Sequence, residues 1–189
     1  LFAKDPQRVY DYNICALKIA EKVKLPVIVA FDGFFTSHQK TRAELIANDK
    51  DVQDFIGELK LEYTSLDKDR PVIIGCYMNE PDLMNNKYQL HLAMEEARTV
   101  IPEVFKEYGE LTGRTYTMVE GYMMEDAEAA LFALGSTYDT ARLAVDELRK
   151  EGKKVGVFTS SVLRPFPKEE LYNICKNVKS IIVADRQDS

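Results

Sequence analysis

Three short apolar runs separated by two amphipathic stretches lie between Asp126 and Asp185, and this alternation constrains the fold more than any other feature of the chain. The runs cover residues 129–134, 155–158 and 181–184. Continuous apolar runs of this length that alternate with helices are typical of parallel strands buried on both faces. We therefore predict an α/β fold with a mostly parallel sheet and helices on both faces.

The charge of the chain argues against a nucleic-acid partner. The 189 residues carry a formal net charge of -6, whereas phosphate contacts require clustered Lys and Arg. No apolar run approaches the roughly 20 residues needed to cross a bilayer, and the start of the sequence lacks the apolar segment of a signal peptide. We expect a cytoplasmic protein with no nucleic acid and no membrane among its partners.

The cysteines and the two ends of the sequence add two expectations. Cys15, Cys76 and Cys175 are odd in number and far apart, which favours a reducing cytoplasm and argues against an iron–sulfur cluster held by this chain alone. The first residue is Leu1, not Met, and the last apolar run ends without a closing helix. Both ends look cut, so we expect a fragment of a longer polypeptide.

The first fifty residues predict one helix and one strand. A helix is expected over residues 5–24, where Pro6 suits the first turn. A strand follows over residues 27–31, and then a polar loop over 36–39. One helix–strand pair is too small to form a domain, so we expect it to be the remnant of a larger α/β unit.

The middle of the chain predicts a linker and one long helix. Residues 48–70 are charge-rich, with a helical turn expected at 52–56, and residues 71–75 suit a short strand or an extended crossing. Pro81 is expected to open the next helix and Gly113 to end it.

The long helix carries an apolar seam. Its apolar residues recur in steps of four and three, and they are Leu90, Met94, Ala97, Ile101, Val104, Tyr108 and Leu111. Pro102 is expected to kink or split the helix. The seam is either a homodimer contact or the face that packs on the chain's own sheet. We favour the sheet, because so short a seam with a proline rarely forms a free-standing coiled coil.

Three side chains follow the expected strand at 27–31, where open parallel sheets bind ligands. They are Asp32, Ser37 and His38. Neighbouring residues point apart, so Ser37 and His38 are not expected to meet as nucleophile and base. His38 lines a site as a general acid or holds the loop by a hydrogen bond, and we favour the hydrogen bond.

Two further groups have competing interpretations. Arg164, in a rigid connector, binds an anion or a partner carboxylate, or it holds the turn by a salt bridge, which we favour. Backbone amides of residues 135–137 bind phosphate, or Ser136 and Asp139 form a capping box, which we favour. No His, Asp or Glu grouping has metal-ligand spacing. Residue chemistry alone thus predicts no catalytic residue and no metal site.

An ordered set of short motifs runs through most of the chain. They are Phe31-Asp32-Gly33-Phe34 with Thr36-Ser37-His38, then Leu111–Tyr116, Asp126-Ala127-Glu128, Ala133–Ser136, Lys154–Gly156, Leu163–Pro167 and Ala184-Asp185-Arg186. In order and spacing the chain resembles the alpha subunit of a 2-oxoacid:ferredoxin oxidoreductase. The phrase D-G-F-x-x-S-H favours pyruvate as the substrate.

The resemblance implies a thiamine-dependent enzyme. Such enzymes decarboxylate a 2-oxoacid on thiamine pyrophosphate with Mg, pass electrons through iron–sulfur clusters to ferredoxin, and transfer the acyl group to coenzyme A. It also implies a division of the chain. Residues 1–50 would be the remnant of a thiamine-fold domain, 51–70 a linker, and 71–189 a domain like the C-terminal domain of transketolase, incomplete at its C-terminus.

Nothing in the chain matches the family's activating glutamate or substrate arginine. We therefore carry over no catalytic residue, leave the cofactor-binding residues unknown, and expect the fragment to be architectural and inactive alone. Its partners would be the other subunits, and ferredoxin indirectly. Two alternatives stay open. One is the C-terminal domain of another thiamine enzyme, and the other is a non-enzymatic α/β module that docks through the long helix.

Overall fold

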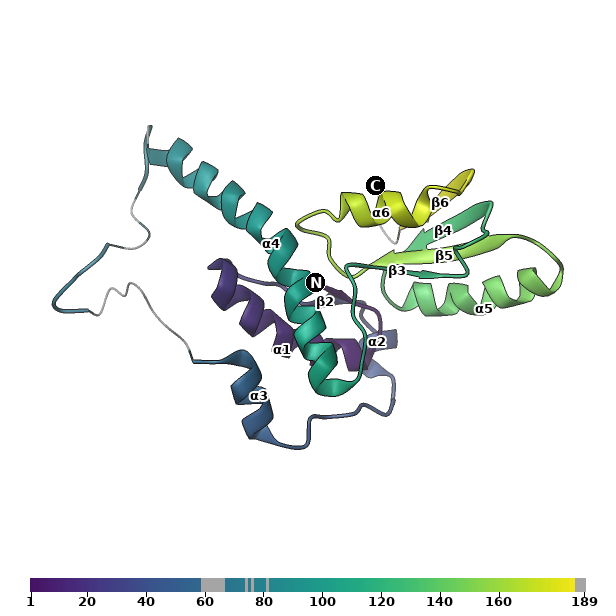
Figure 1. The fold of residues 1–189 in the computed structure, drawn as a ribbon, viewed down its shortest axis with the longest axis horizontal. Helices are drawn as coiled ribbons and strands as arrows, with labels where there is room; N and C mark the ends of the chain where they lie inside the picture. The colour runs from purple at the N-terminus through teal and green to yellow at the C-terminus, as the bar shows by residue number, and fades with distance from the viewer. Residues whose placement is uncertain (59–66, 74, 76, 81, 186–189) are drawn as a thin grey trace.

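A computed structural model describes residues 1–58, 67–73, 75, 77–80 and 82–185 (Figure 1). The elements in chain order are β1 (Phe2–Ala3), α1 (Pro6–Val23), β2 (Ala30–Phe31), α2 (Phe35–His38), α3 (Asp49–Ile56), α4 (Asp82–Thr112), β3 (Val119–Tyr122), β4 (Ala129–Ala133), α5 (Ser136–Lys150), β5 (Val155–Ser160), α6 (Lys168–Cys175) and β6 (Ser180–Ala184). Predictions that concern Cys76, Pro81, Arg186 or residues 59–66 lie outside the described residues.

Helix α1 begins and ends where the sequence predicts. The Asp5 side chain accepts a hydrogen bond from the Arg8 amide at 2.7 Å, and Pro6 occupies the first turn. Lys24 ends the helix in the left-handed conformation, with φ 54°. Helix α3 likewise confirms the helical turn predicted within the linker and extends it to residues 49–56.

The first strand pair is shorter than predicted. Of the strand expected at 27–31, only β2 forms, and it runs parallel to β1, which the sequence did not predict. β2 is short because its hydrogen-bonding partner, β1, offers only two residues, Phe2 and Ala3, for pairing. The loop expected at 36–39 is mostly helical, because α2 covers Phe35–His38.

Helix α4 corrects one prediction, the packing of its seam, and excludes one of the two outcomes expected at Pro102. It is one helix of 31 residues with Pro102 inside it, and it does not split there. Its seam packs on α1 and not on the sheet. The rings of Phe105 and Tyr12 stack with centroids 5.5 Å apart, and Phe55 of α3 contacts Tyr108. Burial of the helix face between Ala97 and Tyr108, on both sides of the proline, offsets the backbone hydrogen bond that the proline removes.

This packing bears on the domain division. The core that joins α1, α3 and α4 also includes Tyr116, Met118 and Val162, so the long helix lies with the first part of the chain. The boundaries at residues 50 and 70 stay a prediction, and the packing favours a boundary after α4.

The sheet confirms the predicted α/β architecture. Its strand order is β3-β5-β4-β6, and β5, β4 and β6 are parallel. Leu131 of β4 pairs with Val157 on one side and with Ile182 on the other. Alternate residues face opposite sides, so Val157 packs under α5 whereas Phe158 packs under α6. Figure 1 shows the two helices on opposite faces of the sheet.

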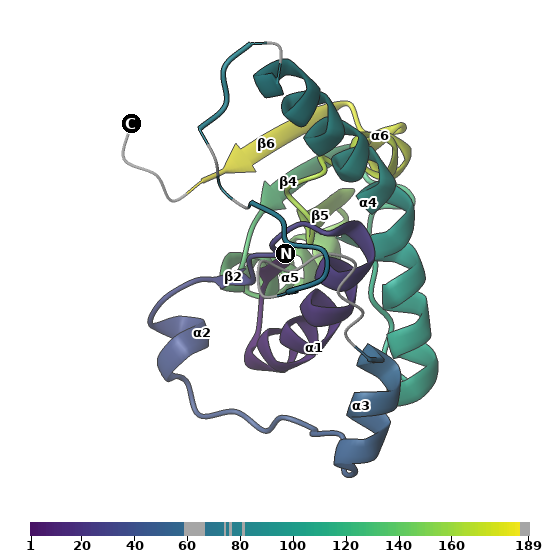
Figure 2. The same cartoon turned by 90° about the vertical axis from the view of Figure 1, so that its left-hand side faces the viewer.

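One strand was missed. β3 lies antiparallel at the edge of the sheet beside β5. Its sequence, Val-Glu-Gly-Tyr, is no apolar run, which is why it gave no signal. At the opposite edge lies β6, seen from the side in Figure 2. In the part of the chain that the structure describes, no helix has both the length and the apolar character to cross a membrane.

Candidate functional site

A cleft opens where strands from both halves of the chain end. It has a volume of about 590 Å³. Its walls come from β1, from the residues that follow β2 and β4, from the start of α5, from the end of β6 and the residue after it, and from the connector after β5. The lining residues are Phe2, Asp32, Gly33, Leu134, Thr137, Leu163, Ala184 and Asp185. The carboxyl ends of parallel strands are where α/β sheets place ligands. Of the candidates named from the sequence, Asp32 lines this cleft, and so does Thr137 of the turn at 135–137.

Asp32 joins the two halves of the chain. Its carboxylate accepts hydrogen bonds from the Ser136 amide at 3.0 Å, from the Ser136 hydroxyl, and from the Thr36 hydroxyl at 3.0 Å. It therefore caps α5 from a position 104 residues earlier in the sequence. Partial burial raises the pKa of Asp32, but the hydrogen bonds from Ser136 and Thr36 outweigh burial and hold the pKa below its ordinary value.

The close approach of Asp32 requires a glycine before the helix. Gly135 has φ 60°, in the left-handed region, and a β-carbon there would lie 2.5 Å from an Asp32 carboxylate oxygen. The capping predicted at this turn therefore forms with a different partner. Helix α5 begins at Ser136 with Gly135 as its N-cap, and Asp32 takes the role expected of Asp139. No local pattern reveals a cap donated from so far away.

The same geometry argues against phosphate binding at this helix. The first amide of α5 already donates to a carboxylate, which also neutralises the positive end of the helix dipole. An anion would have to displace Asp32 and would meet its charge. The turn at residues 135–137 therefore has a structural role: it is the joint at which Asp32 connects the first part of the chain to α5.

Ser37 and His38 do meet, contrary to the sequence argument. The Ser37 hydroxyl oxygen lies 2.6 Å from Nδ1 of His38 and accepts a hydrogen bond from the Phe34 amide at 2.8 Å. The tight turn of α2 brings the two neighbouring side chains to the same side. Both are exposed and neither lines the cleft, so the pair lacks the water-excluding surroundings of a catalytic dyad.

A strained turn that sequence reasoning missed precedes this pair. Phe34 has φ 66° and ψ -68°, and the Phe35 amide donates to the Gly33 carbonyl at 2.9 Å. This is the rare γ-turn with positive φ, which is costly for a bulky residue. The turn leaves the Phe34 ring 75% exposed and stacked on His38, with centroids 6.0 Å apart.

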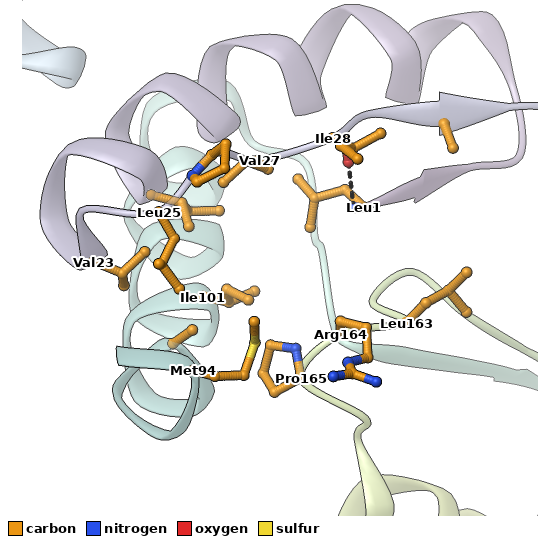
Figure 3. Close-up of a pocket in the computed structure, with 14 residues that line it drawn as sticks. Leu1, Val23, Leu25, Val27, Ile28, Met94, Ile101, Leu163, Arg164 and Pro165 are labelled. Atoms are coloured by element: carbon orange, nitrogen blue, oxygen red, sulfur yellow. Dashed lines mark hydrogen bonds between the residues drawn. The ribbon is translucent and has the colours of Figure 1, made fainter. Parts of the chain in front are cut away.

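Arg164 lies at a second, apolar cavity of about 320 Å³ (Figure 3). The salt bridge expected to hold its turn is not formed among the described residues. Arg98 takes that role instead, because its guanidinium donates to the Phe166 carbonyl at 2.7 Å. The Arg164 guanidinium has no hydrogen-bond or ion-pair partner in the part of the chain that the structure covers.

A buried carboxylate in the helical core was also missed. Asp11 is fully buried and accepts hydrogen bonds from Arg114 at 2.8 Å, from the Tyr108 hydroxyl at 2.6 Å, and from the Tyr116 hydroxyl. Burial and the hydrogen bonds to Asp11 raise the pKa of both tyrosines. The partners lie about a hundred residues apart, so only the fold reveals a network whose role is structural.

The described residues offer no metal site. Among them, no group of three or more His, Cys, Asp or Glu side chains is placed to hold an ion. The two cysteines within these residues, Cys15 and Cys175, are free thiols, and Cys15 is buried.

Comparison with known proteins connects the two halves of the chain. Residues 1–106 match the family model described as "Pyruvate flavodoxin/ferredoxin oxidoreductase, thiamine diP-bdg". Residues 127–189 match "Pyruvate:ferredoxin oxidoreductase core domain II". The two segments that the Asp32 cap joins therefore match two related family models, in order along the chain.

Curated relatives and one solved structure are similar to this chain along most of its length. Pyruvate synthase subunit PorA of Thermotoga maritima is 45% identical over 98% of this chain and 48% of its own length. Ketoisovalerate oxidoreductase subunit VorA of Pyrococcus horikoshii is 39% identical over 100% of this chain and 48% of its own. The chain thus spans about half the length of these relatives. A 2-oxoglutarate:ferredoxin oxidoreductase from Magnetococcus marinus has the same fold, with a TM-score of 0.52 and 18% identity over 91% of this chain and 32% of that one.

Proposed function

The chain belongs to the pyruvate flavodoxin/ferredoxin oxidoreductase family, and from that premise we propose that it is part of the alpha subunit of a 2-oxoacid:ferredoxin oxidoreductase that acts on pyruvate. The observation that carries the proposal is the match of two consecutive family segments, in order, along one chain. The 45% identity to a pyruvate synthase subunit supports pyruvate as the substrate.

We propose that this part of the subunit is a framework. Two groups of polar contacts are central to how the first matched segment joins the sheet and α5. Asp32 caps α5 at one of them. At the other, Glu120 of β3 accepts from Lys4 at 2.9 Å and from Arg8 at 2.6 Å, and all three side chains are largely buried. Charged contacts of this kind fix the orientation of the halves, so that the chain forms one wall of a site whose reactive groups lie elsewhere.

The cofactors proposed for the whole enzyme are thiamine pyrophosphate with Mg, iron–sulfur clusters and coenzyme A. The described residues do not fit the diphosphate and its metal, because Asp32 occupies the helix start next to the cleft and no carboxylate cluster is present among them. The buried thiol of Cys15 does not fit a cluster ligand either. We therefore assign no step of the reaction to these residues.

The residues named from the sequence receive different roles in this proposal. Asp32 is a positioning residue that holds the joint. Ser37 and His38, with the exposed Phe34 ring beside them, form a surface for contact with another subunit or a wall of the complete site. Arg164 is available to a carboxylate of a partner. The partners are the other subunits of the complex, ferredoxin indirectly, and the location is the cytoplasm.

The test is ferredoxin reduction by the assembled enzyme. The full-length subunit, co-purified with the subunits it assembles with, is expected to reduce ferredoxin only when pyruvate and coenzyme A are both present. Because a ketoisovalerate oxidoreductase subunit is 39% identical, 2-oxoisovalerate is the second candidate substrate. A higher kcat/KM for 2-oxoisovalerate than for pyruvate would favour that candidate, and reduction that does not depend on any 2-oxoacid would contradict the proposal.

A further inference from the structure

Beyond its structural role, the buried Asp11 network has the geometry of a redox site. Asp11 of α1 accepts a hydrogen bond from a different tyrosine on each of its two carboxylate oxygens. The Tyr108 hydroxyl donates to Oδ1 at 2.6 Å, and the Tyr116 hydroxyl donates to Oδ2. Tyr108 is 0% exposed and Tyr116 is 7% exposed, and their ring centroids lie 5.9 Å apart. One carboxylate thus joins two buried phenols whose rings are neighbours.

Arg114 holds the carboxylate in its charged form between the two phenols. Its Nη2 and Nε atoms donate to Oδ1 and Oδ2 of Asp11 at 2.8 and 3.1 Å, and a guanidinium stays protonated in proteins. Burial, together with the hydrogen bonds to Asp11, raises the pKa of Tyr108 and of Tyr116, so each phenol keeps its proton. The resting state is therefore two neutral phenols that share one charged base.

This arrangement suits the removal of one electron from a phenol. A phenol that loses an electron becomes a radical cation, which is a far stronger acid than a carboxylic acid. In a buried core the proton cannot pass to bulk water, so it needs a base within hydrogen-bond distance. Asp11 offers one oxygen to each phenol. It can therefore take the proton from either Tyr108 or Tyr116, which leaves a neutral tyrosyl radical beside a neutral carboxylic acid.

Tyr12 lies in the same core but lacks such a base. Its ring centroid is 5.7 Å from that of Tyr116, and its side chain is 0% exposed. Within the described part of the chain, the Tyr12 hydroxyl has no hydrogen-bond partner. Oxidation of Tyr12 would leave a buried charge with no acceptor for its proton, which is costly. The core thus contains two phenols that suit radical formation and one that does not.

We propose that Tyr108, Asp11 and Tyr116 form a radical-holding site, where an electron deficiency that enters the helical core comes to rest. The oxidant is an oxygen-derived radical that takes one electron from a phenol and is itself reduced to its anion, while the phenol proton moves to Asp11.

The radical is then shared between the two tyrosines. Tyr108 passes an electron to the Tyr116 radical and a proton to Oδ1 of Asp11, and Oδ2 returns a proton to the Tyr116 oxygen. The reverse exchange restores the first arrangement. A one-electron reductant ends the cycle, because the electron it supplies and the proton held by Asp11 regenerate the phenol.

The source of the oxidant rests on the proposed function. An enzyme that passes single electrons to ferredoxin generates oxygen-derived radicals when oxygen takes those electrons. The chemistry of the site does not rest on that function, because the two phenols and their base belong to this chain alone. The site takes no part in the reaction proposed for the whole enzyme, so either proposal can fail without the other.

Azidyl radicals generated by a short radiation pulse test the proposal on the 189-residue chain, because they remove single electrons from phenols. Exposed tyrosines such as Tyr172, which is 73% exposed, also form radicals, but these should disappear as two molecules couple through dityrosine. A radical at the buried site cannot couple in this way. A fraction of the tyrosyl absorbance should therefore decay several-fold more slowly, at a rate that does not depend on protein concentration.

Two variants locate the slow radical. The double variant Tyr108→Phe/Tyr116→Phe keeps both rings but removes both phenols, and it should lose the slow fraction. Tyr12→Phe is the matched control, because it removes a buried hydroxyl from the same core without touching Asp11, and it should keep the slow fraction. A cooperative urea transition verifies that each variant is folded.

A measurement on the unmodified chain keeps the test independent of how the variants fold. The trapped radical should show a magnetic coupling to one exchangeable proton, that of the Asp11 carboxylic acid, and the coupling should vanish in deuterium oxide. Four results would overturn the proposal. They are no slow fraction in the unmodified chain, a slow radical without the exchangeable proton, persistence of the slow fraction in the double variant, and its loss in Tyr12→Phe.

Discussion

The helical core and the outer edge of the sheet are both built from apolar side chains, but these side chains are exposed to very different extents. Tyr12 and Tyr108, between α1 and α4, are 0% exposed. Ile182 and Val183 of β6, which point to opposite faces of the sheet, are 66% and 67% exposed. The helical core is closed around its own side chains, whereas the edge strand is open on both sides.

This difference in exposure distinguishes side chains that stabilise the chain from side chains available for contact with other polypeptide. Parallel strands are normally covered on both faces, and an uncovered apolar edge strand is a site where further polypeptide pairs or packs. The curated relatives are about twice as long as this chain. We therefore expect substitutions in the helical core to change the stability of this chain, and substitutions along β6 to change its contacts with other polypeptide.

The largest expected effect concerns Asp11. Asp11→Ala leaves the Arg114 charge and two tyrosine hydroxyls without their partner in the core, which should cost about 3–5 kcal/mol of the free energy of unfolding. Urea denaturation measures the loss. Asp54→Ala removes an exposed carboxylate paired with Lys50 and is the control that should leave the transition unchanged. Similar midpoints for the two variants would mean that the Asp11 network does not hold the core.

The next prediction compares one side chain type in the two regions. Ile19 of α1 is 1% exposed, and Ile19→Ala should cost about 2–4 kcal/mol because it leaves a cavity. Ile182 is two-thirds exposed, so Ile182→Ala should stay within about 0.5 kcal/mol. Urea denaturation of both variants measures the contrast. Equal losses at the two positions would break the comparison.

The stability that Glu120 contributes to the fold is expected to depend on pH. Burial raises the pKa of Glu120, but the charges of Arg8 and Lys4 outweigh burial and lower it. A carboxyl group whose pKa is lowered by folding stabilises the folded state at pH values above the ordinary glutamate pKa of about 4.3. This stabilisation is lost as the pH falls through the pKa of the folded state.

Glu120→Gln should therefore cost about 2–3 kcal/mol at pH 7, and the difference from the unmodified chain should shrink as the solution is acidified. Thermal unfolding followed from pH 7 to pH 3 measures both quantities. A difference that grows towards low pH would mean that the Lys4–Arg8–Glu120 contact does not stabilise the joint.

The smallest of these effects is expected at the Asp32 cap. Asp32→Ala removes the hydrogen bonds to the start of α5 and should cost about 1–2 kcal/mol. Asp139→Ala, in the first turn of the same helix, removes a charge without removing the cap and should cost less. Amide hydrogen exchange should show faster exchange at Ser136 in the Asp32 variant alone. Equal protection of that amide in the two variants would contradict the assigned cap.

The sequence predicted what depends on neighbouring residues. The βαβαβ unit follows from apolar runs and helix periodicity, and so do the bounds of α1 and the end of α4 at Gly113, which has φ 73°. It also predicted that Asp32 lies where strands end. Motif order identified the family through residues spread over the whole chain.

What the sequence missed depends on pairs far apart. β3 became a strand only because β5 offers it an edge. Helix α4 packs on α1 because the fold places them together, although its periodicity suits a sheet or a second helix equally well. Asp32 and Ser136, like Asp11 and Arg114, meet across about a hundred residues, and no local pattern encodes such pairs.

Titration calorimetry of the 189-residue chain with thiamine diphosphate and Mg²⁺ tests most directly whether this chain is a framework whose reactive groups lie elsewhere. The sample is first shown to be folded by a cooperative urea transition. We predict no saturable heat at micromolar to millimolar ligand. Stoichiometric binding with a micromolar dissociation constant would contradict the account, because it would require a diphosphate and metal site made by these residues alone.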